Sequence, residues 1–381
     1  MPKRELWVWL NAMHGMNDVK INNLLDRFGD VDQIYAAKEA DYADIPSISP
    51  KDIANLCDKS PTKANNIIRI IKSSLIKVIT FDDENYPVGL RQLPDPPHIL
   101  YVKGNLLNFS DSFMISVVGT RTNSQYGAEM TYQIAGDLAK AGVVTVSGMA
   151  RGIDTVAHRA TLDAGGKTVA VLGCGLDVVY PPENKALMDE ICQSGAVMTE
   201  FPPTTPPLAY NFPKRNRIVA CLSSGTLVVE GSKSSGSLIT ARLAIDNSRD
   251  LFAIPGNAGK YTSEGTNMLI QNCAKLVSNA NDILSEYPNV KFNIIKETTK
   301  PEIKSPNTVV KKQEINLNDS KYSNVSPNER ALLELILSGN TNIEQIFSES
   351  SLSPSDVNSS LTLLEIKGLI RQTAGKNYEI A

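Results

Sequence analysis

A glycine and an arginine lie in a turn between a strand-like run, Met114–Gly119, and a helix-like segment that begins at Tyr126. The turn opens with Gly119, Thr120 and Arg121. Backbone N–H groups at the start of a helix, together with a guanidinium group, are the groups that bind phosphate in many proteins. The later glycines of the dinucleotide-binding pattern G-x-G-x-x-G are missing, so no dinucleotide site is predicted. A tight structural turn with a solvated Arg121 explains the same residues equally well.

Similar turns follow other strand-like runs of the same region. Ser147 and Gly148 follow the second run, a Gly-Cys-Gly turn follows the third, and a serine-rich turn with Ser235 and Gly236 follows the fifth. Parallel strands end at the same edge of a sheet, and ligands bind at that edge. Several phosphate-compatible turns at one edge are harder to explain as structural turns alone. We therefore expect this edge to bind an anion.

An aromatic residue stands beside three cations at the start of a predicted helix. Phe212 precedes Lys214, Arg215 and Arg217, and residues 201–229 contain no carboxylate. Interleaved aromatic and basic residues are typical of single-stranded nucleic-acid sites, where bases stack and cations meet phosphates. The alternative is a core phenylalanine beside a solvated helix face. Because cations at a helix N-terminus oppose the helix dipole, we favour the interpretation in which an anion lies nearby.

Residue types that could catalyse a reaction are present but isolated. Asp154 at a helix start is interpreted as an N-cap rather than an acid catalyst. His158 has no second histidine near it in sequence and is expected to pack or to bond to a neighbouring loop. Cys174 has no base at a recognisable spacing. Five cysteines without C-x-x-C spacing and only three histidines predict neither a zinc site nor disulfides.

Composition narrows the class of protein further. The chain has 381 residues, of which 42% are hydrophobic and 21% charged, as in globular proteins of two or three domains. Its net charge of −3 argues against a protein that coats nucleic acid through bulk electrostatics. We find no secretory signal and no apolar run near the roughly 18 residues of a membrane span. A cytoplasmic protein without membrane association or cofactor is expected.

Short apolar runs alternate with amphipathic segments in the middle of the chain, which predicts an α/β fold. A Rossmann-like, doubly wound and mostly parallel sheet covered on both faces fits this order. The expected strands are Met114–Gly119, Val143–Ser147, Thr168–Leu172, Ala196–Glu200, Thr226–Glu230 and Asp250–Ile254. The expected helices are Tyr126–Ala141, Asp154–Ala164, Glu183–Gln193, Lys214–Leu222 and Ser237–Asn247.

The two ends of the chain have different patterns. Residues 1–75 show short helical periodicities, which fit a small helical domain of sterile-alpha-motif or helix-hairpin-helix type. Residues 76–286 then form the Rossmann-like domain, including a connector over Phe81–Leu107. Residues 287–325 are polar and read as a flexible linker. Residues 326–381 contain two serine caps that open helices at Pro327 and Pro354, followed by a hairpin, which is a winged-helix outline.

Several strings in these segments resemble the DNA-processing protein A family, also called Smf. They are GTRTNSQYG, SGMARGIDTVAH, GLDVVYPPEN, FPKRNRIVACLS, EGSKSSGSLITARLA, FAIPGN and EGTNMLIQNCAKLV, and they appear in the family's order over about residues 75–285. The resemblance implies a protein that binds single-stranded DNA without chemically altering it. It also implies protection of incoming strands during natural transformation, loading of the RecA recombinase, and a homodimer formed through the Rossmann-like domain.

The resemblance also indicates which residues contact DNA. Arg121 and Lys214 are the first candidates, followed by Arg215 and Arg217, one of which is alternatively expected to hold the loop of Asp154 or Glu200. Some relatives have lysine directly after the Tyr-Pro pair, where this chain has Pro182, and Lys185 is the expected substitute. The full predicted site is Gly119, Thr120, Arg121, Ser147, Gly148, Lys185, Phe212, Lys214, Arg215, Arg217, Ser235 and Gly236.

Two other functions are compatible with parts of the sequence. Ser224-Gly225-Thr226 with Glu230 faintly resembles the motif of nucleotide phosphoribohydrolases, in which a carboxylate beside a phosphate site supports hydrolysis. The fuller Pro-Gly-Gly-x-Gly-Thr string is absent. A transcription factor that acts through the winged helix is the other alternative, but its expected recognition helix, Pro354–Lys367, contains a single cation. A protein-interaction or weak DNA module fits that helix better.

Overall fold

A computed structural model describes residues 1–59, 62–105, 109, 112–293, 325–337, 343–350, 352–373 and 377–380. The chain divides into two compact units, Met1–Glu297 and Thr298–Ala381. The predicted boundaries at residues 75, 286 and 325 stay predictions, and most of the predicted linker, residues 294–324, lies outside the described residues.

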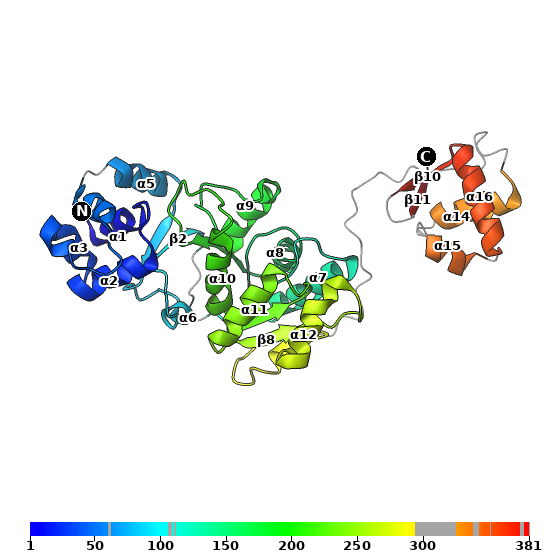
Figure 1. The fold of residues 1–381 in the computed structure, drawn as a ribbon. Helices are drawn as coiled ribbons and strands as arrows, with labels where there is room; N and C mark the ends of the chain where they lie inside the picture. Colours follow the sequence, from blue (N-terminus) through cyan, green and yellow to red (C-terminus); the bar gives the residue numbers. More distant parts are fainter. Residues whose placement is uncertain are drawn as a thin grey trace. The chain divides into compact units, whose positions relative to one another are not determined.

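A nine-stranded sheet forms the centre of the first unit (Figure 1). Its strand order is β1-β2-β6-β5-β4-β3-β7-β8-β9, and the pairs from β6 to β9 are parallel. The parallel strands are β3 (Met114–Val118), β4 (Val144–Ser147), β5 (Thr168–Val171), β6 (Ala196–Thr199), β7 (Gly225–Val228), β8 (Asp250–Ala253) and β9 (Lys275–Leu276). Strands β1 (Lys77–Thr80) and β2 (Ile99–Gly104) add an antiparallel edge beside β6.

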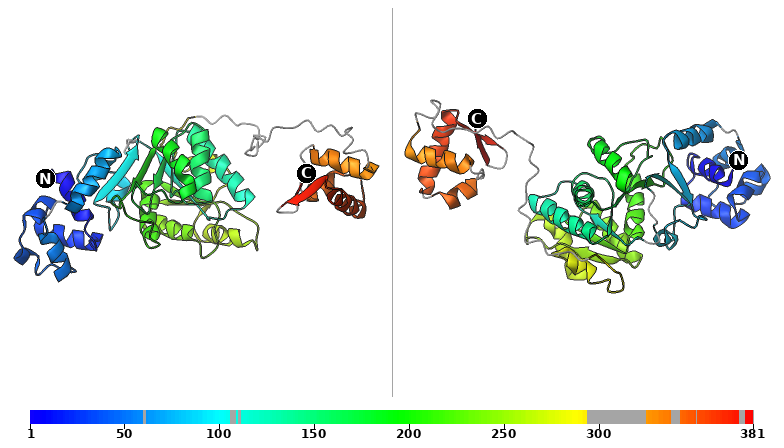
Figure 2. Two further views of the ribbon diagram at one scale, coloured as in Figure 1. Left: turned by 90° about the horizontal axis from the view of Figure 1, so that it is seen from above. Right: turned by 180° about the vertical axis from the view of Figure 1, so that it is seen from behind.

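Helices cover both faces of this sheet because its strands are apolar on both sides (Figures 1 and 2). In β3, Met114 and Val118 belong to one buried cluster, whereas Ile115 and Val117 belong to another. The first face packs against α6 (Val88–Arg91), α10 (Asn211–Leu222), α11 (Gly236–Asp246) and α12 (Glu264–Asn272). The second packs against α7 (Gln125–Lys140), α8 (Ile153–Asp163) and α13 (Ala280–Leu284). Helix α9 (Lys185–Ser194) covers β6 and its neighbours.

The N-terminal region is helical, as its periodicity predicts. Its elements are α1 (Lys3–Asn11), α2 (Asp18–Phe28), α3 (Val31–Ala36), the 3-10 turn η1 (Glu39–Tyr42), α4 (Pro50–Cys57) and α5 (Thr62–Ser73). Their apolar side chains share one buried cluster with residues of the sheet and of α9, including Tyr101, Leu172 and Leu187. The helical region and the sheet therefore have a common core.

Three helices and a hairpin are found among the described residues of the second unit. They are α14 (Pro327–Leu337), α15 (Ile343–Glu349), α16 (Pro354–Ile366), β10 (Ile370–Thr373) and β11 (Asn377–Ile380). Leu333, Ile346, Leu361 and Ile370 belong to its buried core. This arrangement has the predicted winged-helix outline.

The predicted Rossmann-like fold class is confirmed, and each of the six predicted strands lies within one residue of the observed bounds at its start. The stretch Phe81–Leu107, interpreted as a connector, instead contributes α6 and strand β2 to the fold. Its prolines obscure the strand signal, because proline is depleted in strands. Within the described residues, no helix combines the length and apolar character that crossing a bilayer requires.

Candidate nucleic-acid interface

Strands β3 and β7 lie side by side at the point where the strand order reverses. Doubly wound proteins bind ligands in the crevice at such a point. Here a carboxylate of the chain itself occupies this position. Glu230, which is 3% exposed, accepts hydrogen bonds at the start of α7 from the backbone N–H (2.8 Å) and the hydroxyl (2.6 Å) of Ser124. The space beside Gly127 is filled as well, because an added Cβ would lie 2.2 Å from Glu230 Oε2.

The hydrogen bonds of Glu230 argue against the hydrolase alternative. A carboxylate that acts in hydrolysis must face the substrate. Both Glu230 oxygens instead accept bonds from Ser124, and the hydroxyl of Thr262 lies 3.4 Å from one of them. The geometry therefore gives Glu230 the role of holding Ser124, the N-cap residue of α7, and it does not favour phosphoribohydrolase chemistry.

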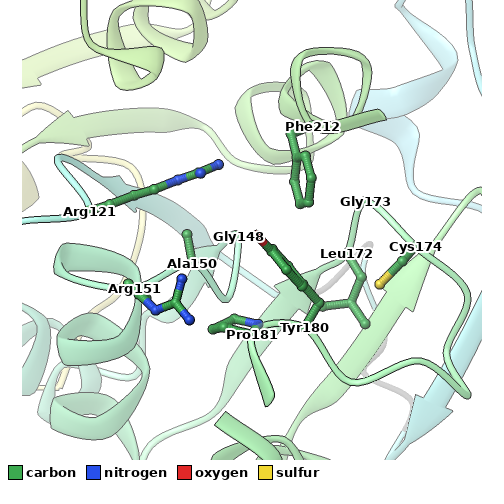
Figure 3. A pocket seen from close by; sticks show the side chains of 10 residues that line it. All are labelled: Arg121, Gly148, Ala150, Arg151, Leu172, Gly173, Cys174, Tyr180, Pro181 and Phe212. Atoms are coloured by element: carbon green, nitrogen blue, oxygen red, sulfur yellow. The ribbon is translucent and has the colours of Figure 1, made fainter. Parts of the chain in front are cut away.

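A small pocket lies one strand further along the same edge, above β4 and β5 (Figure 3). It is lined by Arg121, Gly148, Ala150, Arg151, Leu172, Gly173, Cys174, Tyr180, Pro181 and Phe212. The Arg121 guanidinium extends toward the Phe212 ring, with 5.6 Å between its Cζ and the ring centroid. The Tyr180 and Phe212 ring centroids are 5.4 Å apart. Cations and aromatic faces thus meet in one place, as single-strand recognition requires.

A buried arginine, Arg215, holds the backbone of the pocket loop that follows β4. Arg215 is 4% exposed, and its Nη1 donates to the carbonyls of Gly148 (2.6 Å) and Val171. On the other side, Asp154 Oδ2 accepts from the backbone N–H groups of Gly148 (3.1 Å) and Ala150 (3.2 Å). Asp154 therefore braces the loop before its helix instead of acting as the N-cap, a position that Gly152 occupies. In this structure Arg215 holds the site rather than facing it.

Gly148 shows why the turn needs glycine. A Cβ at this position would lie 2.3 Å from Arg215 Nη1. Likewise, a Cβ on Gly119 would lie 2.5 Å from the Ile153 side chain. The sequence interpretation attributed these glycines to the close approach of a phosphate. In the structure the groups that approach them belong to the chain.

Lys214 and Arg217 face carboxylates from other segments. Lys214 Nζ lies 2.9 Å from Asp18 and 3.2 Å from Glu200, and Arg217 contacts Glu200 (2.8 Å), Asp18 (3.2 Å) and Asp95 (3.1 Å). Burial disfavours the charge on Lys214, but Glu200 and Asp18 outweigh it, so its pKa is raised. The anion expected beside this cationic helix start is thus supplied internally. The sequence offered Glu200 as one such partner, whereas Asp18, about two hundred residues away, could not be inferred from spacing.

The structure brings only some of the predicted site residues together. Arg121, Gly148 and Phe212 line the pocket, with Gly119 and Thr120 in the same turn as Arg121. Arg215, Arg217 and Ser147 are buried, and the Ser147 hydroxyl donates to the Val117 carbonyl (2.7 Å). Lys214 is intermediate in burial, because its side chain is 35% exposed. Ser235 and Gly236 lie at the start of α11, where the Ser235 side chain caps the helix.

The predicted site omits two residues that line the pocket, Arg151 and Tyr180. Arg151 follows strand β4 in the motif SGMARG, so its position after a strand was a usable signal; its guanidinium pairs with exposed Glu183. Lys185, which the predicted site includes, is absent from the pocket lining; it is the first residue of α9, is exposed, and pairs with Asp189 at 3.0 Å.

The remaining candidates for chemistry are structural. His158 is fully buried, its Nδ1 lies 2.7 Å from the Thr168 hydroxyl, and burial together with the charge of Arg215 lowers its pKa to about 3. Burial raises the pKa of the Cys174 thiol to about 11, so the thiolate nucleophile is disfavoured. Among the described residues, no cluster of histidine, cysteine and carboxylate side chains has the arrangement of a metal site.

The fold and this pocket define a Rossmann-like protein with a winged-helix module, and sequence comparison gives its family. Residues 77–288 match the family described as DNA recombination-mediator protein A, and residues 319–376 match the DprA winged helix domain. The chain belongs to the DNA recombination-mediator protein A family, which confirms the resemblance to DprA and Smf proteins.

Individual relatives agree with this assignment. The chain is 29% identical to Protein Smf of Synechocystis sp. over 98% of both chains. It resembles the X-ray structure of DNA processing protein A from Streptococcus pneumoniae, with a TM-score of 0.61, 35% identity and coverage of 77% of this chain and 99% of that one. A Helicobacter pylori structure, described for the single-stranded DNA binding mode of DNA processing protein A, matches with a TM-score of 0.51, 31% identity and coverage of 55% and 94%.

Proposed function

We propose that this protein binds single-stranded DNA at the pocket above β4 and β5 and does not chemically alter it. The observation that carries the proposal is the meeting of Arg121, Arg151, Tyr180 and Phe212 around one opening. A base stacks on the aromatic rings, the Arg121 guanidinium binds a flanking phosphate, and Arg151 binds another phosphate in place of its exposed partner Glu183. The Helicobacter pylori relative, whose structure concerns its single-stranded DNA binding mode, supports this proposal.

The pocket predicts how Arg121→Ala changes binding. Loss of one charge-assisted contact, worth about 1.5–3 kcal/mol, weakens affinity for an oligothymidylate about tenfold or more. It also lowers the slope of log affinity against log salt by about 0.7, the value for one phosphate on a single strand. Fluorescence anisotropy across a salt series measures both quantities.

Arg69→Ala is the matched control, because Arg69 is exposed on α5, away from the pocket. The control should bind like the unsubstituted protein. Equal affinity and equal salt slope for Arg121→Ala and the control would remove Arg121 from the interface. Tighter binding to duplex than to single strands would contradict the proposed function as a whole.

Lys214 needs a test of its own, because its ammonium is already paired. If it binds phosphate, DNA must compete with Asp18, and Asp18→Asn should tighten single-strand binding several-fold while Lys214→Ala weakens it. The reason is that Asp18→Asn removes one of the carboxylates that attract the partly buried Lys214 ammonium, so this ammonium attracts a DNA phosphate more strongly. If neither substitution changes affinity, Lys214 belongs to the junction with the helical region and not to the DNA site.

We propose a positioning role for Arg215 and Arg217. Their guanidinium groups hold the loop of Gly148 and the Glu200 carboxylate, which is the alternative that the sequence left open for one of them. Substitution of either should weaken DNA binding only through the shape of the pocket. The salt slope, which counts phosphate contacts, then stays unchanged while affinity falls.

Recombination mediation is the biological role that we propose for this binding. The family is described as a DNA recombination-mediator protein, which supports loading of the RecA recombinase on the bound strand and protection of incoming DNA during transformation. Displacement of a single-strand-binding protein from DNA by RecA, followed by strand exchange, provides the assay. Acceleration by this protein is expected, and its loss in Arg121→Ala would link mediation to the pocket.

We also propose a homodimer that acts in the cytoplasm. Exposed apolar side chains at the β9 end of the sheet and on α11, namely Leu276 (48%), Ile239 (45%) and Ile245 (44%), supply area that an association can bury. Sedimentation equilibrium should give about twice the chain mass of 41.4 kDa. A single species of monomer mass at micromolar concentration would contradict the proposal.

The winged-helix unit fits a protein-interaction module better than a duplex reader. Lys367, which follows α16, ion-pairs with buried Glu329 at 2.8 Å. The exposed face of α16 presents Leu363 (48%) and Ile366 (76%). Apolar side chains at such exposure favour a protein partner over a phosphate backbone. Tight, sequence-specific mobility shifts of duplex DNA that depend on α16 would contradict this proposal.

A further inference from the structure

A second exposed surface lies at the same edge of the sheet, over the loops that follow β7 and β8. Its residues are Lys233, Lys260, Tyr126 and Tyr261, which we call the β7–β8 surface. The tyrosine residues are 43% (Tyr126) and 67% (Tyr261) exposed, and both lysines are exposed. This is a second combination of aromatic rings and cations, separate from the pocket residues.

Backbone contacts hold the loops of this surface together. The Gly231 N–H donates to the Thr262 carbonyl (2.8 Å), and the Gly265 N–H donates to the Gly231 carbonyl (2.8 Å). The Tyr126 hydroxyl donates to the Pro255 carbonyl (2.9 Å). Side-chain hydrogen bonds with the two serines on either side of Lys233 lower the pKa of Tyr261. The rings and cations are therefore held together by contacts between the loops after β7 and β8 and the start of α7.

The charge of these loops suits an anion. Residues 231–245 and 251–263 contain no carboxylate, and Lys233 and Lys260 of the surface lie within them. Glu264, which directly follows, is the one acid whose charge acts on Tyr261. The nearest preceding acid, Glu230, is buried and bonded to Ser124. A surface with exposed rings, cations and few acids matches the two properties of a nucleic-acid strand, its bases and its phosphates.

The β7–β8 surface is continuous with the pocket. The Thr120 N–H donates to the Glu230 carbonyl (2.8 Å), and the Ile153 N–H donates to the Thr120 carbonyl (3.2 Å). The Arg121 turn thus contacts the β4 loop on one side and the β7 loop on the other. From β5 to β8 the sheet order contains four spacings of about 4.8 Å, so the two surfaces lie roughly 20 Å apart along the edge.

We propose that the β7–β8 surface is a second subsite for the same single strand, which passes from the pocket over the Arg121 turn to Tyr261. This inference rests on the proposed function. It adds a directional path and a longer footprint to it. Bases stack on Tyr261 and Tyr126, while Lys233 and Lys260 meet the phosphates between them.

The test compares oligothymidylates of about six and about twenty nucleotides, lengths that bracket common single-strand site sizes. The full chain should bind the longer oligonucleotide at least tenfold more tightly. Tyr261→Ala combined with Lys233→Ala should remove most of this gain and leave affinity for the short oligonucleotide unchanged. Tyr132→Ala is the control, because Tyr132 is a 49% exposed tyrosine on α7 whose hydroxyl bonds to Asp163.

Each outcome decides between the two proposals. Unchanged length dependence in the double variant overturns the second subsite and leaves the pocket intact. Equal loss for short and long oligonucleotides also overturns it, since the two surfaces would then not be separable. Absence of binding to any oligonucleotide by the unsubstituted protein overturns the proposed function itself. Photo-crosslinking of 5-iodo-deoxyuridine near one end of the long oligonucleotide should label the peptide that contains Tyr261.

Discussion

The ion cluster around Arg217 provides the sharpest test of the architecture, through Arg217→Met. The methionine keeps an unbranched apolar stem and removes the charge. Arg217 and Glu200 side chains are both 5% exposed, and Asp18 is 15% exposed. The substitution therefore leaves two carboxylates at a largely buried site without their principal cation.

The size of the effect follows from these contacts. At about 3 Å and an effective dielectric constant near 20, each pair attracts by roughly 5–6 kcal/mol before desolvation is subtracted. Removal of one partner of a buried pair typically costs about 3–5 kcal/mol. Asp95, which is 51% exposed, adds less than about 1 kcal/mol. We expect the free energy of unfolding of the first unit to fall by about 3–4 kcal/mol.

Tryptophan fluorescence in urea is a suitable assay. The chain has two tryptophans, Trp7 and Trp9, both buried in α1 of the helical region. Arg217 contacts that region through Asp18, so the fluorescence reports on the elements that the cluster joins. Arg242→Met is the control, because its side chain is 84% exposed and should change stability by less than about 0.5 kcal/mol.

A second substitution separates charge from packing. In Arg217→Met, Glu200 and Asp18 share Lys214 as their remaining cation, so Glu200→Gln on that background removes the excess negative charge and should restore part of the lost stability. The two changes then differ from additivity by more than about 1 kcal/mol. A loss below about 1 kcal/mol for Arg217→Met, or strict additivity, would refute the view that this cluster holds the two regions together.

Two further predictions concern titratable and buried groups. His158 stays neutral in the folded protein, with its pKa lowered to about 3, whereas in the unfolded chain it protonates near pH 6.5, so stability falls by roughly 1.4 kcal/mol per pH unit as pH decreases below that value. His158→Gln should lose less stability between pH 7 and pH 5 than the exposed-site control His14→Gln, as urea midpoints will show; equal losses would contradict the burial argument. In the winged-helix unit, Glu329→Gln removes the ion pair with Lys367 but keeps an amide oxygen that accepts from the Ser326 N–H, so loss of the charge alone should cost α14 about 1–3 kcal/mol of hydrogen-exchange protection in the full chain. Unchanged protection of α14 would show that this pair contributes nothing.

The strands were predictable because burial on both faces leaves an unmistakable apolar run. Thr168–Val171 and Ala196–Thr199 are such runs, and each is fully buried. Strand β2 has the same burial at its start but follows a proline-rich turn, and its pairing partner β6 lies about a hundred residues away. Local pattern identifies a strand, whereas its neighbour in the sheet depends on contacts that no local pattern contains.

The cations of α10 illustrate a feature that the sequence alone could not identify, namely the anion that they contact. Residues 201–229 have no acid, and the cations at the helix start led to the expectation of a bound anion beside them. It could not distinguish a DNA phosphate from Asp18 or Glu200, which approach from a different helix and from the preceding strand end. Arg121 and Phe212, both members of the predicted site, line one pocket at the carboxyl edge of the sheet, and their contact with DNA stays a prediction.

Glycine gave a similar partial signal. The turn at Gly148 was identified from its place after a strand, but the side chain that requires glycine there is Arg215. A sequence shows that a close approach exists without showing what approaches. The predicted phosphate contacts of Gly119, Ser147, Gly148, Ser235 and Gly236 accordingly remain predictions.

The common core of the N-terminal helices and the sheet determines how this protein unfolds. Trp7, Ile34 and Leu56 from the helices belong to the same buried cluster as Tyr101, Leu172 and Val197 from the sheet and its edge. Neither side can melt without exposing the apolar side chains of the other to water. Heat and urea should therefore unfold Met1–Glu297 in one cooperative step, and a protease should find no intermediate in which the helices alone have loosened.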